Sequence, residues 1–173
     1  MTLSLGPVAD AYILSAVPMT NYGAVTTLWV GRQSERALNR SLFRFDLSSI
    51  PEDATVLSAG FRASLVGASD TPRMLNVELK QVDTAWGEAT VTWSTPFDYT
   101  GVDNVLAVGT PAGYYSWDVT SLVRTWVSGG ARSNYGLALW SADEDLLGWR
   151  GFAGREYTGV APLPPQLEVT YLP

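Results

Sequence analysis

The stretch that decides the fold runs from Gly113 to Gly130 and reads GYYSWDVTSLVRTWVSGG. Its first part, residues 114–118, is rich in aromatic side chains and alternates polar with apolar residues, which is typical of a half-buried strand. Its second part changes period, because apolar residues recur at i, i+3, i+4 and i+7 and therefore share one face of a short helix. The residues on this face are Val119, Leu122, Val123 and Trp126.

The ends of this helix also carry signals. Thr120 is expected to act as the N-cap, because its hydroxyl can accept a hydrogen bond from the free amides of the first turn. Gly129 and Gly130 are expected to end the helix, since glycine tolerates positive φ. No other stretch of the chain has so clear a helical pattern. We interpret this helix as a plug that closes one end of a β-sandwich.

Short strands surround this unit on both sides. Leu75, Val77 and Leu79 alternate with polar residues, which indicates a sheet with one face in water. The segment 83–96, with Trp86 and Trp93, is interpreted as a packed excursion between the sheets. Many short strands with one helix predict an all-β, antiparallel sandwich or jelly roll. The other predicted strands are 8–15, 27–30, 41–47, 55–66, 105–108, 137–141, 149–153 and 166–172.

The composition excludes several classes of function. The chain of 173 residues contains no Cys and no His, which excludes disulfides, thiolate zinc sites, cysteine nucleophiles and histidine-based triads. Its net charge of −6 argues against a nucleic-acid partner. No apolar run is long enough to span a bilayer, so we expect no membrane insertion. Residues 1–4 show no secretory signal, so we expect either that a signal was removed or that the protein leaves the cell by another route, for instance in a virion.

A series of motifs runs in order along almost the whole chain, from about residue 8 to residue 171. The motifs are Asp10-Ala11-Tyr12, Asn21-Tyr22-Gly23, SLFRFDLSSIP from Ser41 to Pro51, Trp86…Glu88…Thr90-Val91-Thr92-Trp93, Ser116-Trp117-Asp118-Val119-Thr120, Asn134-Tyr135-Gly136-Leu137, Phe152-Ala153-Gly154-Arg155-Glu156 and Pro165 to Tyr171. The series resembles the DNRLRE domain, a bacterial and archaeal surface module related to a family of carbohydrate-binding modules. The resemblance implies one domain over residues 1–173 with a jelly-roll β-sandwich fold. Some members of the family are similar to modules that bind acidic polysaccharides such as alginate.

Basic and aromatic residues are the candidates for binding a glycan. Arg44 and Arg62 fall on the outward side of two core strands, and with Lys80 they would form a basic comb if those strands were neighbours. Arginine suits uronates because its planar fork matches a carboxylate. Trp140 and Trp149 are the candidate platforms for sugar rings. The alternative is that the arginines pair with surface carboxylates such as Glu78 and that the tryptophans fill the core and the seat of the helix.

Three aspartates at strand ends are the candidate metal ligands. Jelly-roll binding modules often hold a structural Ca²⁺ near such ends, bound by carboxylates and backbone carbonyls. Asp10, Asp46 and Asp118 occupy these positions. The alternative for Asp46 and Asp118 is capping, with Asp46 on the amides of residues 48–49 and Asp118 on the start of the helix.

Three functions remain open from the sequence, and none is enzymatic. No spacing argument brings Glu88 and Glu156 together as the two carboxylates that a glycosidase needs, so we expect no enzyme. The first candidate is an extracellular or cell-surface module that binds carbohydrate, with an anionic polysaccharide as ligand. The second is a phage virion structural protein that acts through contacts with virion proteins or other copies of itself. The third is a cell-surface adhesion or spacer domain.

Overall fold

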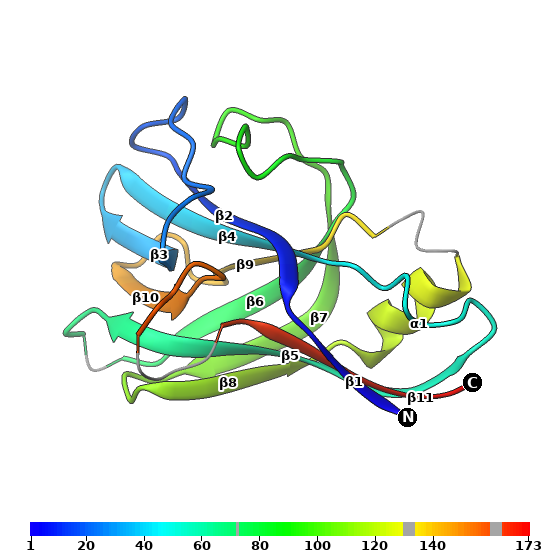
Figure 1. Ribbon diagram of the computed structural model, residues 1–173. Coiled ribbons are helices and arrows are strands. Elements are labelled where there is room, and N and C mark those ends of the chain that lie inside the picture. Colours follow the sequence, from blue (N-terminus) through cyan, green and yellow to red (C-terminus); the bar gives the residue numbers. More distant parts are fainter. Residues whose placement is uncertain (72, 130–133, 160–163) are drawn as a thin grey trace.

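A computed structural model describes residues 1–71, 73–129, 134–159 and 164–173. These described residues form an antiparallel sheet of eleven strands. The sheet folds over into two facing layers, as Figure 1 shows. This confirms the predicted all-β sandwich with one short helix. The strands are β1 (Thr2–Leu5), β2 (Pro7–Leu14), β3 (Thr27–Ser34), β4 (Ala37–Phe45), β5 (Thr55–Ala68), β6 (Leu75–Val82), β7 (Tyr99–Val108), β8 (Gly113–Asp118), β9 (Leu137–Ser141), β10 (Gly148–Ala153) and β11 (Gln166–Leu172), and the helix is α1 (Thr120–Ser128).

The pairing of the strands defines the two layers. In the first layer β4 pairs with β2 and β9, β9 pairs with β6, and β6 pairs with β7. In the second layer β5 pairs with β11 and β8, and β11 pairs with β1. Strands β3 and β10 join the layers, because β3 pairs with β4 and β10 pairs with both β3 and β5.

The main core lies between the layers and follows the predicted alternation. Leu75, Val77 and Leu79 of β6 are each at most 1% exposed, as expected for one face of a half-buried strand. Helix α1 closes one end of the core with Leu122 and Trp126, which are 7% and 0% exposed. The interpretation of α1 as a plug is therefore confirmed.

The start of α1 differs from the sequence prediction. The N-cap position is Val119, and Thr120 is the first helical residue. The Thr120 hydroxyl instead accepts a hydrogen bond from the amide of Ala59 on β5 at 2.9 Å, so it ties the helix to the sheet. At the other end the C-cap Gly129 has a φ of −88°, which is not the positive value expected. Gly130 lies outside the described residues.

Two strand predictions were incomplete, and one excursion lies elsewhere than expected. Strand β1 was not predicted, and β7 begins six residues before the predicted 105, at Tyr99. The excursion 83–96 does not lie between the sheets. It covers the outer face of the first layer, where Trp86 and Val91 bury Leu42 and Ala138 in a second apolar cluster. Leu42 and Ala138 point away from the main core because Phe43 and Leu137 beside them point into it.

Gly136 allows a close approach of two backbone segments in the first layer. Its φ is +95°, and a Cβ at this position would overlap the carbonyl oxygen of Phe43. Only glycine meets both requirements, because other residues rarely adopt this φ. Gly136 thereby lets the loop before β9 enter the layer beside β4.

Arg150 of β10 lies in the interior with 0% exposure. Its guanidinium donates hydrogen bonds to four backbone carbonyls, those of Val108 (3.2 Å), Gly109 (2.6 Å), Trp149 (2.8 Å) and Arg73 (2.8 Å). Burial lowers the pKa of this guanidinium from its usual value. Arg150 therefore supplies donors to backbone carbonyls of strands and loops that meet in the interior.

The two ends of the chain lie side by side at one corner of the sandwich (Figure 1). Strand β1 pairs with β11 from Thr2↔Thr170 to Leu5↔Leu167. The N-terminal ammonium donates to the carbonyl oxygen of Tyr171 at 2.6 Å. No helix in the described ranges is both long and apolar enough to cross a membrane.

Candidate functional site

The two arginines of the predicted basic comb lie on opposite sides of the molecule. Arg44 is on β4 in the first layer and Arg62 is on β5 in the second, and these strands do not pair. The comb does not form, because β10 and β3 lie between β5 and β4 in the strand order.

Each of these arginines has local partners. Arg44 donates to the carbonyl oxygen of Trp86 at 3.0 Å, and its guanidinium lies 5.5 Å from the centre of the Trp86 ring. Arg62 lies 4.6 Å from the centre of the Tyr114 ring and pairs with Glu168 at 3.8 Å. The Arg62–Glu168 pair matches the alternative of a surface ion pair, although the partner is not the Glu78 named for it.

Lys80 and Trp140 are brought together on the outer face of the first layer. The Lys80 ammonium lies 4.3 Å from the centre of the Trp140 ring and 3.0 Å from the Glu78 carboxylate. The indole N–H of Trp140 donates to the other oxygen of Glu78 at 3.2 Å. Trp140 is half-buried, so it is neither a core residue nor a freely exposed platform.

Arg40 approaches the same ring and was not among the predicted site residues. Its guanidinium lies 4.1 Å from the centre of the Trp140 ring and 4.8 Å from that of Trp93. It forms two parallel hydrogen bonds of 2.8 Å with the Glu144 carboxylate. Because β9 lies between β4 and β6, Arg40 and Lys80 reach Trp140 from neighbouring strands on either side. We call this group the Trp140 surface, and it consists of Arg40, Glu78, Lys80, Trp93, Tyr99, Trp140 and Glu144.

A hollow of about 180 Å³ lies beside the Trp140 surface. Arg40, Trp93 and Tyr99 belong to its lining, so the surface offers aromatic walls with a cation between them. The Tyr99 and Trp140 rings stand 4.9 Å apart at their centres, which fixes their orientations. The remaining lining residues are Ile13, Thr95 and Phe97.

The sequence contained a signal for Arg40 that was not used. Arg40, Leu42 and Arg44 alternate along β4 with residues that point to the other face, so extending the predicted strand by one residue toward its start would have placed Arg40 on the outward face. The strand was predicted to begin only at residue 41, because residues 33–39 are polar.

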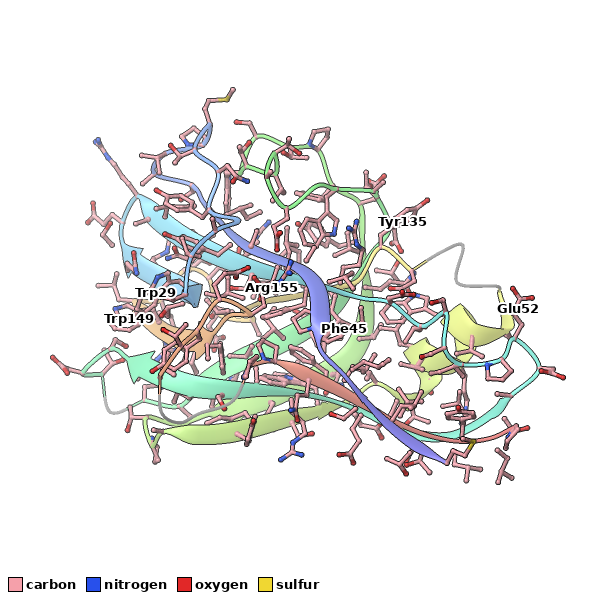
Figure 2. The ribbon with its side chains drawn as sticks, in the orientation of Figure 1. Trp29, Phe45, Glu52, Tyr135, Trp149 and Arg155 are labelled. Carbon is pink, nitrogen blue, oxygen red and sulfur yellow. The ribbon has the colours of Figure 1, made fainter. Side chains whose placement is uncertain are left out.

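Trp149 lies at a different place, with a partner that was not predicted. It lies beside Trp29, as Figure 2 shows. The two rings meet edge to face with their centres 5.0 Å apart, and both tryptophans are half-buried. A Cβ on Gly67 would stand 3.6 Å from the Trp149 ring and 3.7 Å from the Trp29 ring, so both rings lie over this glycine of β5. Trp149 is therefore separate from Lys80 and Trp140, with which it was grouped as a glycan candidate.

A larger hollow of about 540 Å³ lies beside α1. Its lining includes Asp118, Asn104 and Gln81 but none of the arginines, lysines or tryptophans predicted to bind a glycan. The hollow therefore lacks the aromatic walls that the Trp140 surface has.

Two of the three candidate metal ligands accept hydrogen bonds from residues of their own turns. The Asp46 carboxylate accepts a hydrogen bond from the amide of Ser48 at 2.9 Å. The Asp118 carboxylate accepts from the amide of Thr120 at 2.9 Å and from its hydroxyl at 2.6 Å. These hydrogen bonds lower the pKa of both carboxyl groups. Both contacts are those that the capping alternative expected.

Asp10 lies in a different environment. It is only 1% exposed, and its carboxylate comes together with those of Glu88 and Glu156, with one oxygen from each residue within 4.8 Å of the others. Arg155 bridges this group by pairing with Glu88 at 3.1 Å and with Glu156 at 3.4 Å. Burial, together with the two neighbouring carboxylates, raises the pKa of Asp10 to about 7. The sequence placed Asp10 among the metal candidates but gave no sign that Glu88 and Glu156 lie beside it.

Comparison with known proteins places the whole fold in a family. The model of carbohydrate-binding module family 96 matches residues 1–171. The tRNA nuclease WapA of Bacillus subtilis strain 168 is 26% identical over 180 aligned positions, and the tRNA3(Ser)-specific nuclease WapA of Bacillus spizizenii is 24% identical. Each match covers 97% of this chain and 7% of the relative, so the chain corresponds to a small part of these proteins.

Proposed function

The chain belongs to carbohydrate-binding module family 96, and on this premise we propose that it binds a polysaccharide, without catalysis, through the Trp140 surface. Modules of this family bind rather than cleave, in line with the expectation that the chain is not an enzyme. The observation that carries the proposal is the approach of Arg40 and Lys80 to the ring of Trp140, at 4.1 and 4.3 Å.

The chemistry of this surface matches that of a sugar. A sugar ring has apolar C–H faces and hydroxyls that both donate and accept hydrogen bonds. Trp93 and Trp140 supply aromatic walls, Arg40 and Lys80 supply donors, and the carboxylates that pair with them supply acceptors. Binding sites commonly combine apolar walls with a few placed polar groups of this kind.

We further propose that the polysaccharide carries uronate groups. Lys80 has three donors and pairs with one carboxylate, Glu78, among the described residues. Its remaining donors are available to the carboxylate of a uronate, and charge-assisted hydrogen bonds of this type are stronger than neutral ones. Arg40 uses two of its five donors on Glu144, so its remaining donors are available to the sugar hydroxyls beside the uronate.

The test is binding to a panel of polymers. Alginate and polygalacturonate represent uronates, and an uncharged β-glucan and a mannan represent neutral polymers. Affinity electrophoresis and titration calorimetry are expected to show binding to a uronate polymer and a loss of about tenfold or more in Trp140→Ala, because aromatic contacts dominate many binding sites. Thermal unfolding checks that the variant is folded. No binding of the wild type to any polymer of the panel would contradict the proposal, and binding unaffected by Trp140→Ala would move the site elsewhere.

A carbohydrate-binding module needs access to polysaccharide, and this need supports a location outside the cell. The chain matches 7% of the length of the WapA nucleases, which is the pattern of a small accessory module in a large protein. We propose that the module is extracellular or displayed on a surface, where it meets polysaccharide. Whole-cell labelling with an antibody against the module, with and without permeabilisation, tests this location.

The virion and spacer alternatives instead require contacts with protein. Their strongest support is the edge strand β1, which within the described part of the chain pairs with β11 alone and lies at one end of the strand order. Such an edge can pair with another chain. Light scattering during size-exclusion chromatography would show a multimer if copies join through this edge. Ser4→Pro removes an N–H of β1 that faces away from β11, so it should abolish the multimer without affecting the Trp140 surface.

A further inference from the structure

Three carboxylates from distant parts of the chain meet away from the Trp140 surface. Asp10 lies on β2, Glu88 lies in the excursion that covers the first layer, and Glu156 follows β10. Asn21 fixes the backbone here by donating to the carbonyl oxygens of Glu88 at 2.8 Å and Val91 at 2.7 Å. The amide of Asp10 in turn donates to the Glu88 carboxylate at 2.9 Å. These hydrogen bonds hold the segments that carry the carboxylates in place.

Two buried oxygens of this group have no donor among the described residues. These are Oδ1 of Asp10, in a residue that is 1% exposed, and Oε2 of Glu156. The second Asp10 oxygen accepts from the amide of Arg155 at 2.8 Å. Leaving a buried acceptor without a partner is costly, and the cost is larger when the acceptor is charged.

The charges in the cluster do not balance. Three carboxylates face one guanidinium, that of Arg155, which pairs with Glu88 and Glu156 and reaches Asp10 only through its backbone amide. Gly154 lies beside the cluster, and a Cβ there would stand 3.2 Å from the carbonyl oxygen of Val25 and 3.5 Å from Oδ2 of Asp10. Glycine at position 154 therefore keeps a side chain out of an oxygen-rich space.

We infer that Asp10, Glu88 and Glu156 form a structural site for a hard divalent cation, with Ca²⁺ as the ion. Ca²⁺ takes oxygen ligands at about 2.3–2.6 Å, so oxygens on opposite sides of the ion lie about 4.6–5.2 Å apart. The three carboxylate oxygens lie within 4.8 Å of one another, which fits this spacing. Mg²⁺ is less suitable, because it requires a tighter octahedron and gives up its water reluctantly.

The competing explanation is a proton. Because burial and its neighbours raise the pKa of Asp10 to about 7, a proton shared between Asp10 and Glu156 would also satisfy the two orphan oxygens. The two explanations differ in one respect that can be measured, since only the first makes the stability of the protein depend on calcium.

The experiment uses the whole chain, stripped with EDTA and dialysed at neutral pH. Calorimetric titration with CaCl₂ is expected to show one ion bound per chain, and the Tm is expected to rise by about 5–10 °C when free Ca²⁺ is about 100 times Kd. EGTA should reverse the rise, and MgCl₂ at the same concentration should give a smaller one. Asp10→Asn, which keeps the shape of the side chain, is expected to abolish both the heat and the Tm shift.

Two further variants keep the test decisive. Glu156→Gln removes the other orphan oxygen and replaces Asp10→Asn if that variant does not fold. Asp46→Asn is the matched control, because Asp46 is an aspartate at a strand end that lies outside the cluster and should keep the full calcium response. An unchanged Tm in Ca²⁺ for the wild type, or a calcium response that survives in Asp10→Asn or Glu156→Gln, would overturn the inference. An equal response to Mg²⁺ would overturn the choice of Ca²⁺.

Discussion

The rings of Phe43 and Phe61 meet across the core with their centres 4.9 Å apart. The contact shows that Phe43 and Phe61 both point into the core, each from its own layer. Because side chains alternate along a strand, Arg44 and Arg62 point away from the core on opposite layers. A glycan bound to one face of the molecule therefore touches at most one of these two arginines.

Lys80 and Arg62 are consequently expected to differ in their effect on glycan binding. Lys80→Ala should weaken binding of a uronate polymer by about tenfold, because it removes a charge-assisted hydrogen bond beside Trp140. Arg62→Ala should leave the Kd within about twofold, since Arg62 lies on the other layer with Glu168. Titration calorimetry measures both values. A larger loss in Arg62→Ala than in Lys80→Ala would place the site on the second layer instead.

Trp126 is expected to carry much of the stability of the helix plug. Trp126→Ala should lower the free energy of unfolding by about 3–5 kcal/mol, because the ring is 0% exposed and its removal leaves a cavity. Denaturant unfolding followed by fluorescence measures this change. Trp140→Ala, at a half-buried ring, is the matched control and should cost clearly less. Equal losses in the two variants would contradict the role of α1 as the seal of the core.

Gly136→Ala is expected to destabilise the protein strongly. The substitution forces alanine into a φ of +95° and drives its Cβ into the carbonyl oxygen of Phe43, so a loss of about 2–3 kcal/mol or more is expected. Gly113→Ala separates the two causes, since Gly113 has a φ of +140° with no atom within 4 Å of the added Cβ, and it should cost less. Gly6→Ala, with open space around it, should change stability by less than about 0.5 kcal/mol.

Arg150→Lys is expected to cost about 2–4 kcal/mol of stability, although it keeps the charge. An ammonium cannot reproduce the planar fork that serves four carbonyls, so buried acceptors are left without donors. Chemical denaturation measures the loss. The exposed Arg36 provides the control, and Arg36→Lys should have little effect. If Arg150→Lys left the free energy of unfolding unchanged, this would show that water takes over the hydrogen bonds of the guanidinium.

Asp118 is expected to make part of the stability depend on pH. Hydrogen bonds from Thr120 lower the pKa of Asp118 in the folded state, so its contribution is fully present above the unfolded pKa of about 3.9 and is lost as the pH falls through the lower folded value. The difference in Tm between the wild type and Asp118→Ala should therefore be constant near neutral pH and shrink below about pH 4. A difference that grows on acidification would contradict this sign.

Much of the fold followed from local patterns. Alternating residues in β6 show which face of that strand is buried, and the spacing of Leu122 and Trp126 does the same for α1. In each segment a single periodicity of apolar residues was enough to predict the element and its buried face. Strand β1 was missed because four residues of alternating character give little signal without β11 beside them. The place of the excursion was wrong because Trp86 and Val91 do not indicate which of two faces they will cover.

The candidate site was less accessible to sequence reasoning, since it depends on which strands are neighbours. Lys80 and Trp140 were both named, but the strand that brings Arg40 to them was predicted to begin four residues too late, at residue 41 instead of Ala37. Glu88 was considered only as a catalytic group, because nothing in the sequence shows that its carboxylate contacts the amide of Asp10, 78 positions away. Such contacts are made by tertiary pairing and leave no periodic trace.

The antiparallel pairing of β1 with β11 has a consequence for how such a unit joins other polypeptide. Any segments that precede Met1 and follow Pro173 leave from the same corner, close to the ammonium–Tyr171 contact. A host protein could accept the unit within a surface loop without moving the loop's two anchor points far apart. The sandwich would then be attached to its host at this one corner, and the rest of its surface would face away from the host.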